Sequence, residues 1–300
     1  SYSNAFLFPS FSLCQYLKMF LFFPVNVDNV AALTEWASNH LTKLRGFFET
    51  DDLERAKFYI DELNVPPLDW KNRNVNFGER RTDKIALPLL GLSLPEEILK
   101  TKRPLRSKKD GSCLFNSISL ALTGTEDYAT FFRLLAAMYM ILNSDECEGL
   151  MTTADWRHNV ESYKKELSYT LAQSGTGSAF TIEIAGRALE IAIESLFPNF
   201  GDDSPFANYR NTNNRIFNPD QVNDQQITIL WCSTYNIQDR LFAFNHFVPI
   251  VNCDTNSASK NARGAATATA KKAKLVQEMP TEETSKTGKY YILITNDEFM

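Results

Sequence analysis

The sequence has few of the residues that build metal centres and disulfide frameworks. Its 300 residues include five cysteines and three histidines. No two cysteines form a C-x-x-C pair, and the five are scattered along the chain: Cys14, Cys113, Cys147, Cys232 and Cys253. An odd, dispersed set argues against a zinc site or a disulfide framework and fits reduced thiols in an intracellular, cytoplasmic setting. We therefore expect neither a metal nor a cofactor.

Long apolar runs and an excess of positive charge are also missing. The stretch "AFLFPSFSLCQYLKMFLFFPVNV" is interrupted by Pro9, Ser12 and Lys18, so it falls short of the ~18 apolar residues of a spanning helix. It has no basic leader region or initiating methionine. We interpret it as buried packing surface in a fragment or processed chain, with membrane association as the alternative. The formal net charge of −5 gives no global field for nucleic acid or an anionic membrane, and neither partner is expected.

The composition is that of a soluble globular protein with a large aromatic core. Hydrophobic residues make up 44% and charged residues 22%, and phenylalanine occurs 22 times. Between residues 28 and 63, apolar side chains recur at spacings of three and four, which predicts helices, with Asp28 as a cap. "SLPEEILK" at 93–100 predicts another short helix. We therefore assign residues 1–97 to a helical N-terminal region of unknown role.

Residues 98–300 are predicted to form a second unit with both helices and strands. Helical patterns cover 126–143, 156–173 and 180–197, the last stopped by Pro198. The polar stretch 201–224 is predicted as a loop, and 226–233 and 241–251 are predicted as strands. Residues 254–289 are poor in apolar side chains other than alanine, which predicts a disordered loop. "YYILITNDEF" then predicts a final strand.

"DGSCLFNSISLALTG", residues 110–124, contains the best candidate nucleophile. Asp110 and Gly111 predict a turn, and the apolar pattern after it predicts a helix that ends at Gly124. Cys113 would lie in the first turn of that helix, where free N–H groups favour a thiolate and can bind an oxyanion. The alternative is a small buried hydrophobic residue.

A cysteine nucleophile needs a base, and His246 is the best candidate. His40 and His158 lie in charged helical patterns typical of surface residues. His246 lies in "LFAFNHFVPIV", where a strand would place it on one face with Val248 and Ile250. The alternative is a hydrogen-bonded core histidine.

Together, "DGSCLF" and the downstream "NHFVPIV" resemble the ovarian-tumour (OTU) family of cysteine proteases. The resemblance covers roughly residues 100–255. It implies an α+β, papain-like fold in which a small β-sheet is flanked by helices, here with the extra helical N-terminal region. It also implies that Cys113 is the nucleophile and His246 the base. The chain departs from the family's pattern at the residue that orients the histidine, because many relatives have Asp or Asn two residues after the histidine, where this chain has Val248. Asp110 is the favoured replacement, and its alternative role is to cap the turn.

The resemblance further implies a deubiquitinase, a thiol-dependent isopeptidase that removes ubiquitin or a related modifier from lysines or chains. The N–H groups of Cys113 and of the Lys108–Gly111 loop would bind the oxyanion. Phe115, Trp231 and Phe247 are candidates for lining the substrate groove, although core packing is the favoured role for each. Two other functions stay open: a protease that processes its own precursor polyprotein, and a non-catalytic ubiquitin-binding scaffold. The preferred linkage or modifier and the oligomeric state are not indicated.

Overall fold

The computed structural model describes most of the chain between residues 29 and 253. The described residues are 29–68, 75, 77, 80–153, 162–172, 175, 177–204, 206–221, 225–237, 239 and 242–253. The N-terminal apolar stretch, His158, the predicted loop 254–289 and the predicted final strand lie outside them.

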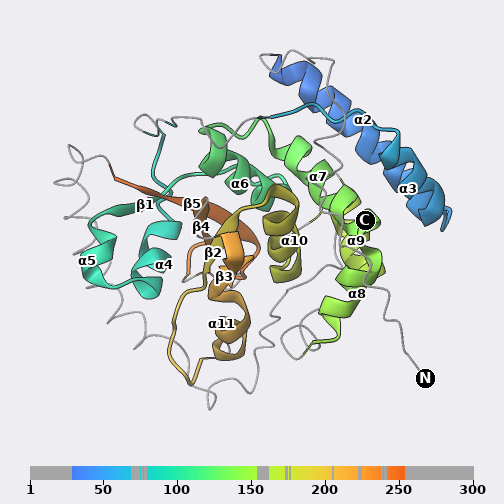
Figure 1. The fold of residues 1–300 in the computed structure, drawn as a ribbon. Coiled ribbons are helices and arrows are strands. Elements are labelled where there is room, and N and C mark those ends of the chain that lie inside the picture. Colours follow the sequence, from blue (N-terminus) through green and yellow to red (C-terminus); the bar gives the residue numbers. More distant parts are fainter. Residues whose placement is uncertain are drawn as a thin grey trace.

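A five-stranded sheet in the order β1-β5-β4-β2-β3 forms the centre of the molecule (Figure 1). Its strands are β1 (Lys102–Pro104), β2 (Ala192–Leu196), β3 (Arg215–Phe217), β4 (Gln226–Cys232) and β5 (His246–Asn252). β2 and β4 are parallel, and the other neighbouring strands are antiparallel. The short edge strand β1 pairs with the far end of β5, from Ile250 to Asn252. The first residues of β5 therefore do not pair with β1.

Alternating side chains of the central strands pack into two separate apolar clusters. On one face, Ile229, Trp231 and Phe247 join the cluster that holds the core of α6 (Cys113–Thr123), α7 (Ala129–Leu142) and α10 (Ala179–Leu189). On the other face, Leu230 and Val248 pack with α4 (Ala86–Ser93) and Leu99 at the end of α5 (Glu96–Leu99). The strands are thus buried on both sides, which explains their nearly continuous apolar sequence.

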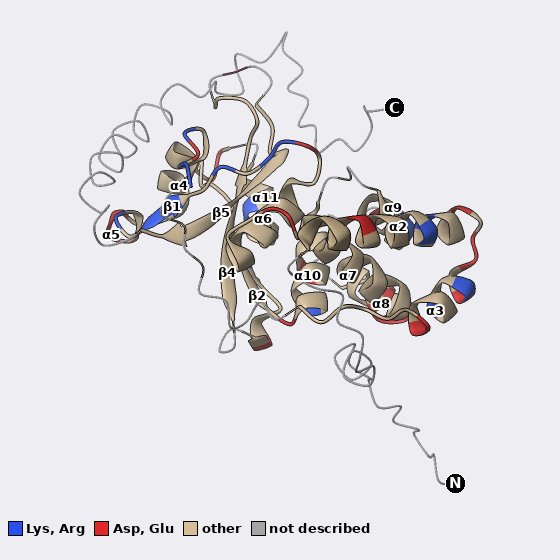
Figure 2. Ribbon diagram, turned by 90° about the horizontal axis from the view of Figure 1, so that it is seen from above, with Lys and Arg blue, Asp and Glu red and all other residues tan. Residues whose placement is uncertain are grey.

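Four other helices form an outer layer beside α7 (Figure 1). They are α2 (Val30–Glu49), α3 (Leu53–Asp61), α8 (Ser144–Met151) and α9 (Tyr163–Leu171). The periodicity predicts Val30, Leu33, Ala37, Leu41 and Leu44 on the inward face of α2; Val30 is half-buried and the other four are buried. Its N-cap is Asn29 rather than the predicted Asp28, and the Asn29 side chain accepts the N–H of Ala32 at 3.1 Å. Charged positions gather on these outer helices, whereas α6 has none (Figure 2).

The structure corrects two sequence predictions. The helix predicted over 180–197 ends at Leu189, and Ala192–Leu196 form β2 instead. Glu190 adopts a left-handed conformation with φ 53°, and the Asn218 side chain donates to the carbonyls of Gly186 and Ile191. These contacts end the helix where the sequence has no glycine to signal it.

The predicted loop 201–224 contains more regular structure than expected. It includes α11 (Ala207–Asn213), β3 and a 3-10 turn at Pro219–Gln221. The predicted architecture, a small sheet flanked by helices, is confirmed. Among the described helices, none is both long and apolar enough to cross a membrane.

Candidate active site

The turn before α6 places Cys113 at the first position of the helix. Gly111 has φ 77°, a conformation that glycine adopts without strain. The Asp110 carboxylate accepts the N–H of Ser112 at 3.0 Å and the side-chain amide of Asn116 at 2.8 Å. At the other end, Gly124 is the left-handed C-cap. These observations confirm the predicted turn, helix start and helix end.

Two serine hydroxyls, one before and one after this turn, form hydrogen bonds with the start of β5, which does not pair with β1. The N–H of Leu105 donates to the carbonyl of Pro249 at 2.9 Å, and beyond it β1 no longer pairs with β5. The carbonyl of Phe247 instead accepts the hydroxyls of Ser107 at 2.7 Å and Ser117 at 2.8 Å. Because Ser117 lies on α6, these bonds fix the Cys113 helix against the strand that begins with His246.

The sulfur of Cys113 lies against the backbone on both sides of His246. The thiol is 3% exposed and donates to the carbonyl oxygen of Asn245 at 3.9 Å. Burial is the main influence on this thiol and raises its pKa to about 11. Hydrogen bonds from the backbone N–H groups of Phe247 and Leu114, and the charge of Arg133, act in the opposite direction. The resting sulfur is therefore a protonated thiol at neutral pH.

His246 is buried with one ring nitrogen paired and the other free. Nε2 lies 3.2 Å from the hydroxyl oxygen of Ser107. Nδ1 is buried and has no hydrogen-bond partner among the described residues, Cys113 included. The pKa of His246 is lowered to about 4, mainly by burial; the charge of Lys109 also lowers it, whereas Asp83 and Asp110 act in the opposite direction. The imidazole is therefore neutral at pH 7.

This buried neutral histidine predicts a loss of stability in mild acid. Its pKa is about 4 in the folded protein against an ordinary value of 6.5. Between these two values the unfolded chain binds the proton and the folded chain does not, so stability falls as the pH drops from 6.5 to 4. The contribution is about 3 kcal/mol, and urea unfolding at several pH values measures it. In His246→Gln this part of the pH dependence should disappear; an unchanged profile would contradict the assignment.

Arg133 on α7 is a buried cation that forms hydrogen bonds with the turn before Cys113. Its guanidinium donates to the carbonyls of Gly111 and Gly175 and to the Ser112 hydroxyl, at 3.0 to 3.4 Å. It also donates to the carbonyls of Tyr169 and Ala172. Burial lowers the pKa of Arg133 to about 10, so it stays charged at neutral pH. One side chain thus ties the turn to the segment between α9 and α10.

Replacing Arg133 by methionine is expected to destabilise the protein by about 3 kcal/mol, because several buried carbonyls lose their donor. Arg133→Lys should restore little of this, since a single ammonium cannot reproduce the planar fork. Urea unfolding measures both variants, and Arg45→Met on the exposed face of α2 is the control. If Arg133→Met lowers the free energy of unfolding by less than about 0.5 kcal/mol, the guanidinium does not stabilise the turn.

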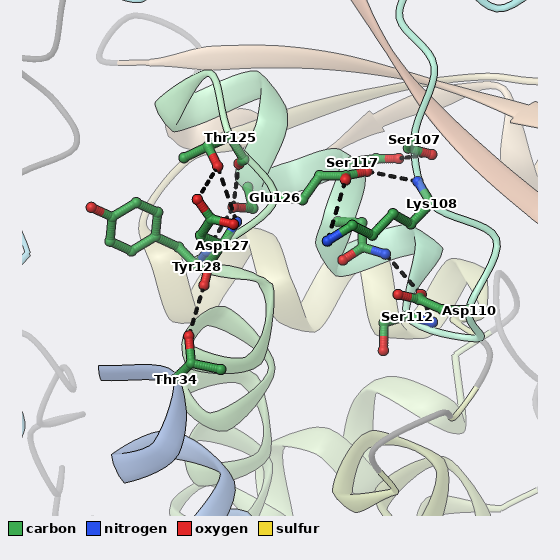
Figure 3. A network of polar contacts seen from close by, with 12 residues as sticks. Thr34, Ser107, Lys108, Asp110, Ser112, Ser117, Thr125, Glu126, Asp127 and Tyr128 are labelled. Carbon is green, nitrogen blue, oxygen red and sulfur yellow. Dashed lines mark hydrogen bonds and ion pairs between the residues drawn. The ribbon is translucent and has the colours of Figure 1, made fainter. Parts of the chain in front are cut away.

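Glu126 engages part of the loop that was expected to bind the oxyanion. Its carboxylate accepts the backbone N–H of Lys108 at 2.6 Å and lies 3.8 Å from the Lys108 ammonium. One residue further on, the carbonyl of Asp127 accepts the hydroxyl of Thr34 on α2 (Figure 3). The N–H of Lys108 is therefore already used, which corrects the expectation for that residue. Cys113 and the rest of the loop remain candidates.

Comparison with known proteins adds a structural likeness. No protein-family model and no curated protein matches the chain. Among solved structures, matches include the OTU domain of OTUD1, with 14% identity and a TM-score of 0.33, covering 54% of this chain and 98% of that one. The viral OTU domain protease from Farallon virus has 16% identity and a TM-score of 0.35, covering 60% and 99%. An OTU domain solved in complex with ubiquitin has 17% identity and a TM-score of 0.32, covering 60% and 90%.

This chain is similar to OTU domains. In its candidate site, Cys113 and the backbone of His246 are brought together. Asp110 makes its hydrogen bonds with Ser112 and Asn116, and none joins it to His246 in the described part of the chain. Its role as the orienting residue stays a prediction. The residue that does contact the imidazole, Ser107, carries no sequence signal, because the two are 139 residues apart.

The aromatic residues considered for the groove pack in the apolar core. Phe115, Trp231 and Phe247 are at most 6% exposed and belong to one apolar cluster. The indole N–H of Trp231 donates to the Ser195 hydroxyl at 2.8 Å. Core packing, rather than lining of the groove, is thus confirmed for these three residues. Within the described residues, no group of three or more histidine, cysteine or acidic side chains is arranged to hold a metal ion.

Proposed function

We propose that the protein is a cysteine isopeptidase of the OTU type that cleaves ubiquitin, or a related modifier, from lysine side chains or from modifier chains. One observation supports it most. A cysteine at a helix N-terminus lies against the backbone on both sides of a buried histidine whose Nδ1 has no partner. A neutral imidazole with a free nitrogen is the form that can accept a thiol proton.

The reaction is acyl transfer in two stages. The Cys113 sulfur attacks the carbonyl carbon of the modifier's last glycine, and its proton passes to Nδ1 of His246. The imidazolium then gives that proton to the departing lysine amine, and the C–N bond breaks to leave a thioester. A water molecule, deprotonated by the same nitrogen, attacks the thioester and releases the modifier's carboxylate and the thiol.

Both groups start neutral in this mechanism. The raised pKa of Cys113 and the lowered pKa of His246 mean that the proton moves as the sulfur attacks. The negative oxygen that forms next would be bound by the N–H of Cys113 at the start of α6, where the helix dipole is favourable. Residues Lys109–Gly111 of the preceding loop are the other candidate donors.

A ubiquitin probe that ends in a propargyl group tests the proposal, because its alkyne traps a cysteine nucleophile that the bound modifier aligns. We expect a covalent adduct at Cys113, identified by peptide mass spectrometry. A panel of linkage-defined di-ubiquitins then reports the preferred chain. The proposal fails if ubiquitin neither forms an adduct nor is cleaved from any linkage at enzyme concentrations that saturate binding.

A non-catalytic ubiquitin-binding scaffold is the second candidate function. It is favoured by the burial of the Cys113 thiol and by the lack of a hydrogen bond from it to the imidazole. Titration with unmodified ubiquitin, followed by calorimetry, separates the two candidates. Binding without adduct formation or cleavage would favour the scaffold.

A further inference from the structure

We propose that Ser107 is the positioning residue of His246 and takes the place that an acidic or amide side chain holds in many relatives. Its hydroxyl fixes the imidazole as the Nε2–H tautomer and leaves Nδ1 as the base. The catalytic meaning of this assignment rests on the proposed function, whereas the assignment of the tautomer does not.

The argument begins with the single proton of the Ser107 hydroxyl. That hydroxyl is buried, 2.7 Å from the carbonyl oxygen of Phe247 and 3.2 Å from Nε2 of His246. A carbonyl oxygen can only accept, so the Ser107 proton points to Phe247. The hydroxyl oxygen is then left to accept, and Nε2 must be the nitrogen that donates to it.

Neighbouring contacts favour this arrangement. The Ser117 hydroxyl donates to the same Phe247 carbonyl at 2.8 Å and lies 3.5 Å from Ser107. A carbonyl oxygen has two lone pairs, so it satisfies both serines without turning either proton toward the imidazole. Ser117 therefore braces the carbonyl, while Ser107 both braces it and contacts the ring.

The consequence for His246 is a defined base. If Nε2 carries the proton, Nδ1 has the lone pair, and Nδ1 is the nitrogen that is buried without a partner among the described residues. The charged groups that influence this ring, Asp83, Lys109 and Asp110, act from a distance. A hydroxyl adds no negative charge, so this site orients its histidine without the strong stabilisation of imidazolium that a carboxylate gives.

The first test measures the tautomer directly and needs no activity. The nitrogen-15 spectrum of the imidazole rings, recorded at pH 7, distinguishes Nε2–H from Nδ1–H by the couplings to the ring protons. The chain has three histidines, and the His246→Gln spectrum assigns the signal. We expect Nε2–H in the native protein and a mixture of tautomers in Ser107→Ala. A native Nδ1–H tautomer, or an unchanged tautomer in Ser107→Ala, would overturn the assignment even if the protein cleaves ubiquitin well.

The second test separates positioning from a merely structural role. Ser107→Ala should lower kcat for a fluorogenic ubiquitin substrate by about tenfold or more, part of what a positioned base contributes, with KM within about twofold. Ser117→Ala loses a bond to the same carbonyl but not the ring contact, so its loss of kcat should be clearly smaller than that of Ser107→Ala. Ser107→Thr, which keeps the hydroxyl, should recover most of the rate. Equal losses in the two alanine variants would show that only the Phe247 carbonyl matters. Absence of any activity in the native protein would refute the proposed function, while the tautomer would still decide the role of Ser107.

Discussion

Replacing Cys113 by alanine is expected to abolish both probe capture and cleavage of ubiquitin chains, a loss of at least about 10³-fold. The sulfur forms the covalent bond in the proposed mechanism, so no other group replaces it. The side chain occupies a small buried volume at the start of α6, and its removal should cost only about 1 kcal/mol of stability. A fluorogenic ubiquitin substrate measures the rate, and circular dichroism confirms that the variant is folded.

The matched control is Cys147→Ala. Cys147 is a buried thiol on α8, and burial raises its pKa to about 12, so it resembles Cys113 in environment but not in position. This variant should keep its rate within about twofold. Cleavage at the native rate by Cys113→Ala would rule out the cysteine mechanism. Equal losses of rate in the two variants would indicate damage to the fold.

Replacing His246 by glutamine is expected to lower kcat by about 10² to 10⁴-fold, which is the usual contribution of a general base. Glutamine is similar in size and can still donate to Ser107 through its amide, but it has no nitrogen that accepts a proton. Single-turnover measurement of thioester formation isolates the affected step. Ubiquitin affinity should change little, because the His246 side chain is buried and offers almost no surface to a ligand.

His40→Gln is the control for this substitution. His40 lies on α2, where its ring contacts the hydroxyl of Tyr59 on α3, and burial lowers its pKa. Its replacement should leave the rate unchanged. A His246→Gln variant that forms the thioester at the native rate would show that another group removes the proton.

Local signals in the sequence were sufficient to predict the element that carries Cys113. The Asp110–Gly111 turn and the terminal Gly124 both have the conformations that these residue types favour. The same reasoning failed at 180–197, because a run of apolar residues fits a helix face and a strand buried on both sides equally well. Glu190 ends α10 in a left-handed conformation, beside the carbonyls of Gly186 and Ile191 that accept the Asn218 side-chain amide.

The pairing of Ser107 with His246 could not have been predicted in the same way. It depends on where β1 stops beside β5, and therefore on the register of two strands that are distant in the chain. A serine in a loop has no periodicity and no spacing rule. The nucleophile and the histidine are identifiable by residue type and local pattern, but the neutral group beside the ring emerges only from the folded topology.

The attachment of α2 matters for how the protein can be studied. Thr34 bonds to the carbonyl of Asp127, next to the glutamate that holds the backbone of Lys108, and Leu33 and Leu41 cover the apolar core beside α7. A shortened version that starts at the sheet would leave this helical surface facing water and would loosen the segment just ahead of the cysteine. Weak turnover by such a truncated protein would then result from the loss of α2 rather than from the active site itself. Comparisons of specificity should therefore retain the chain from residue 29 onward.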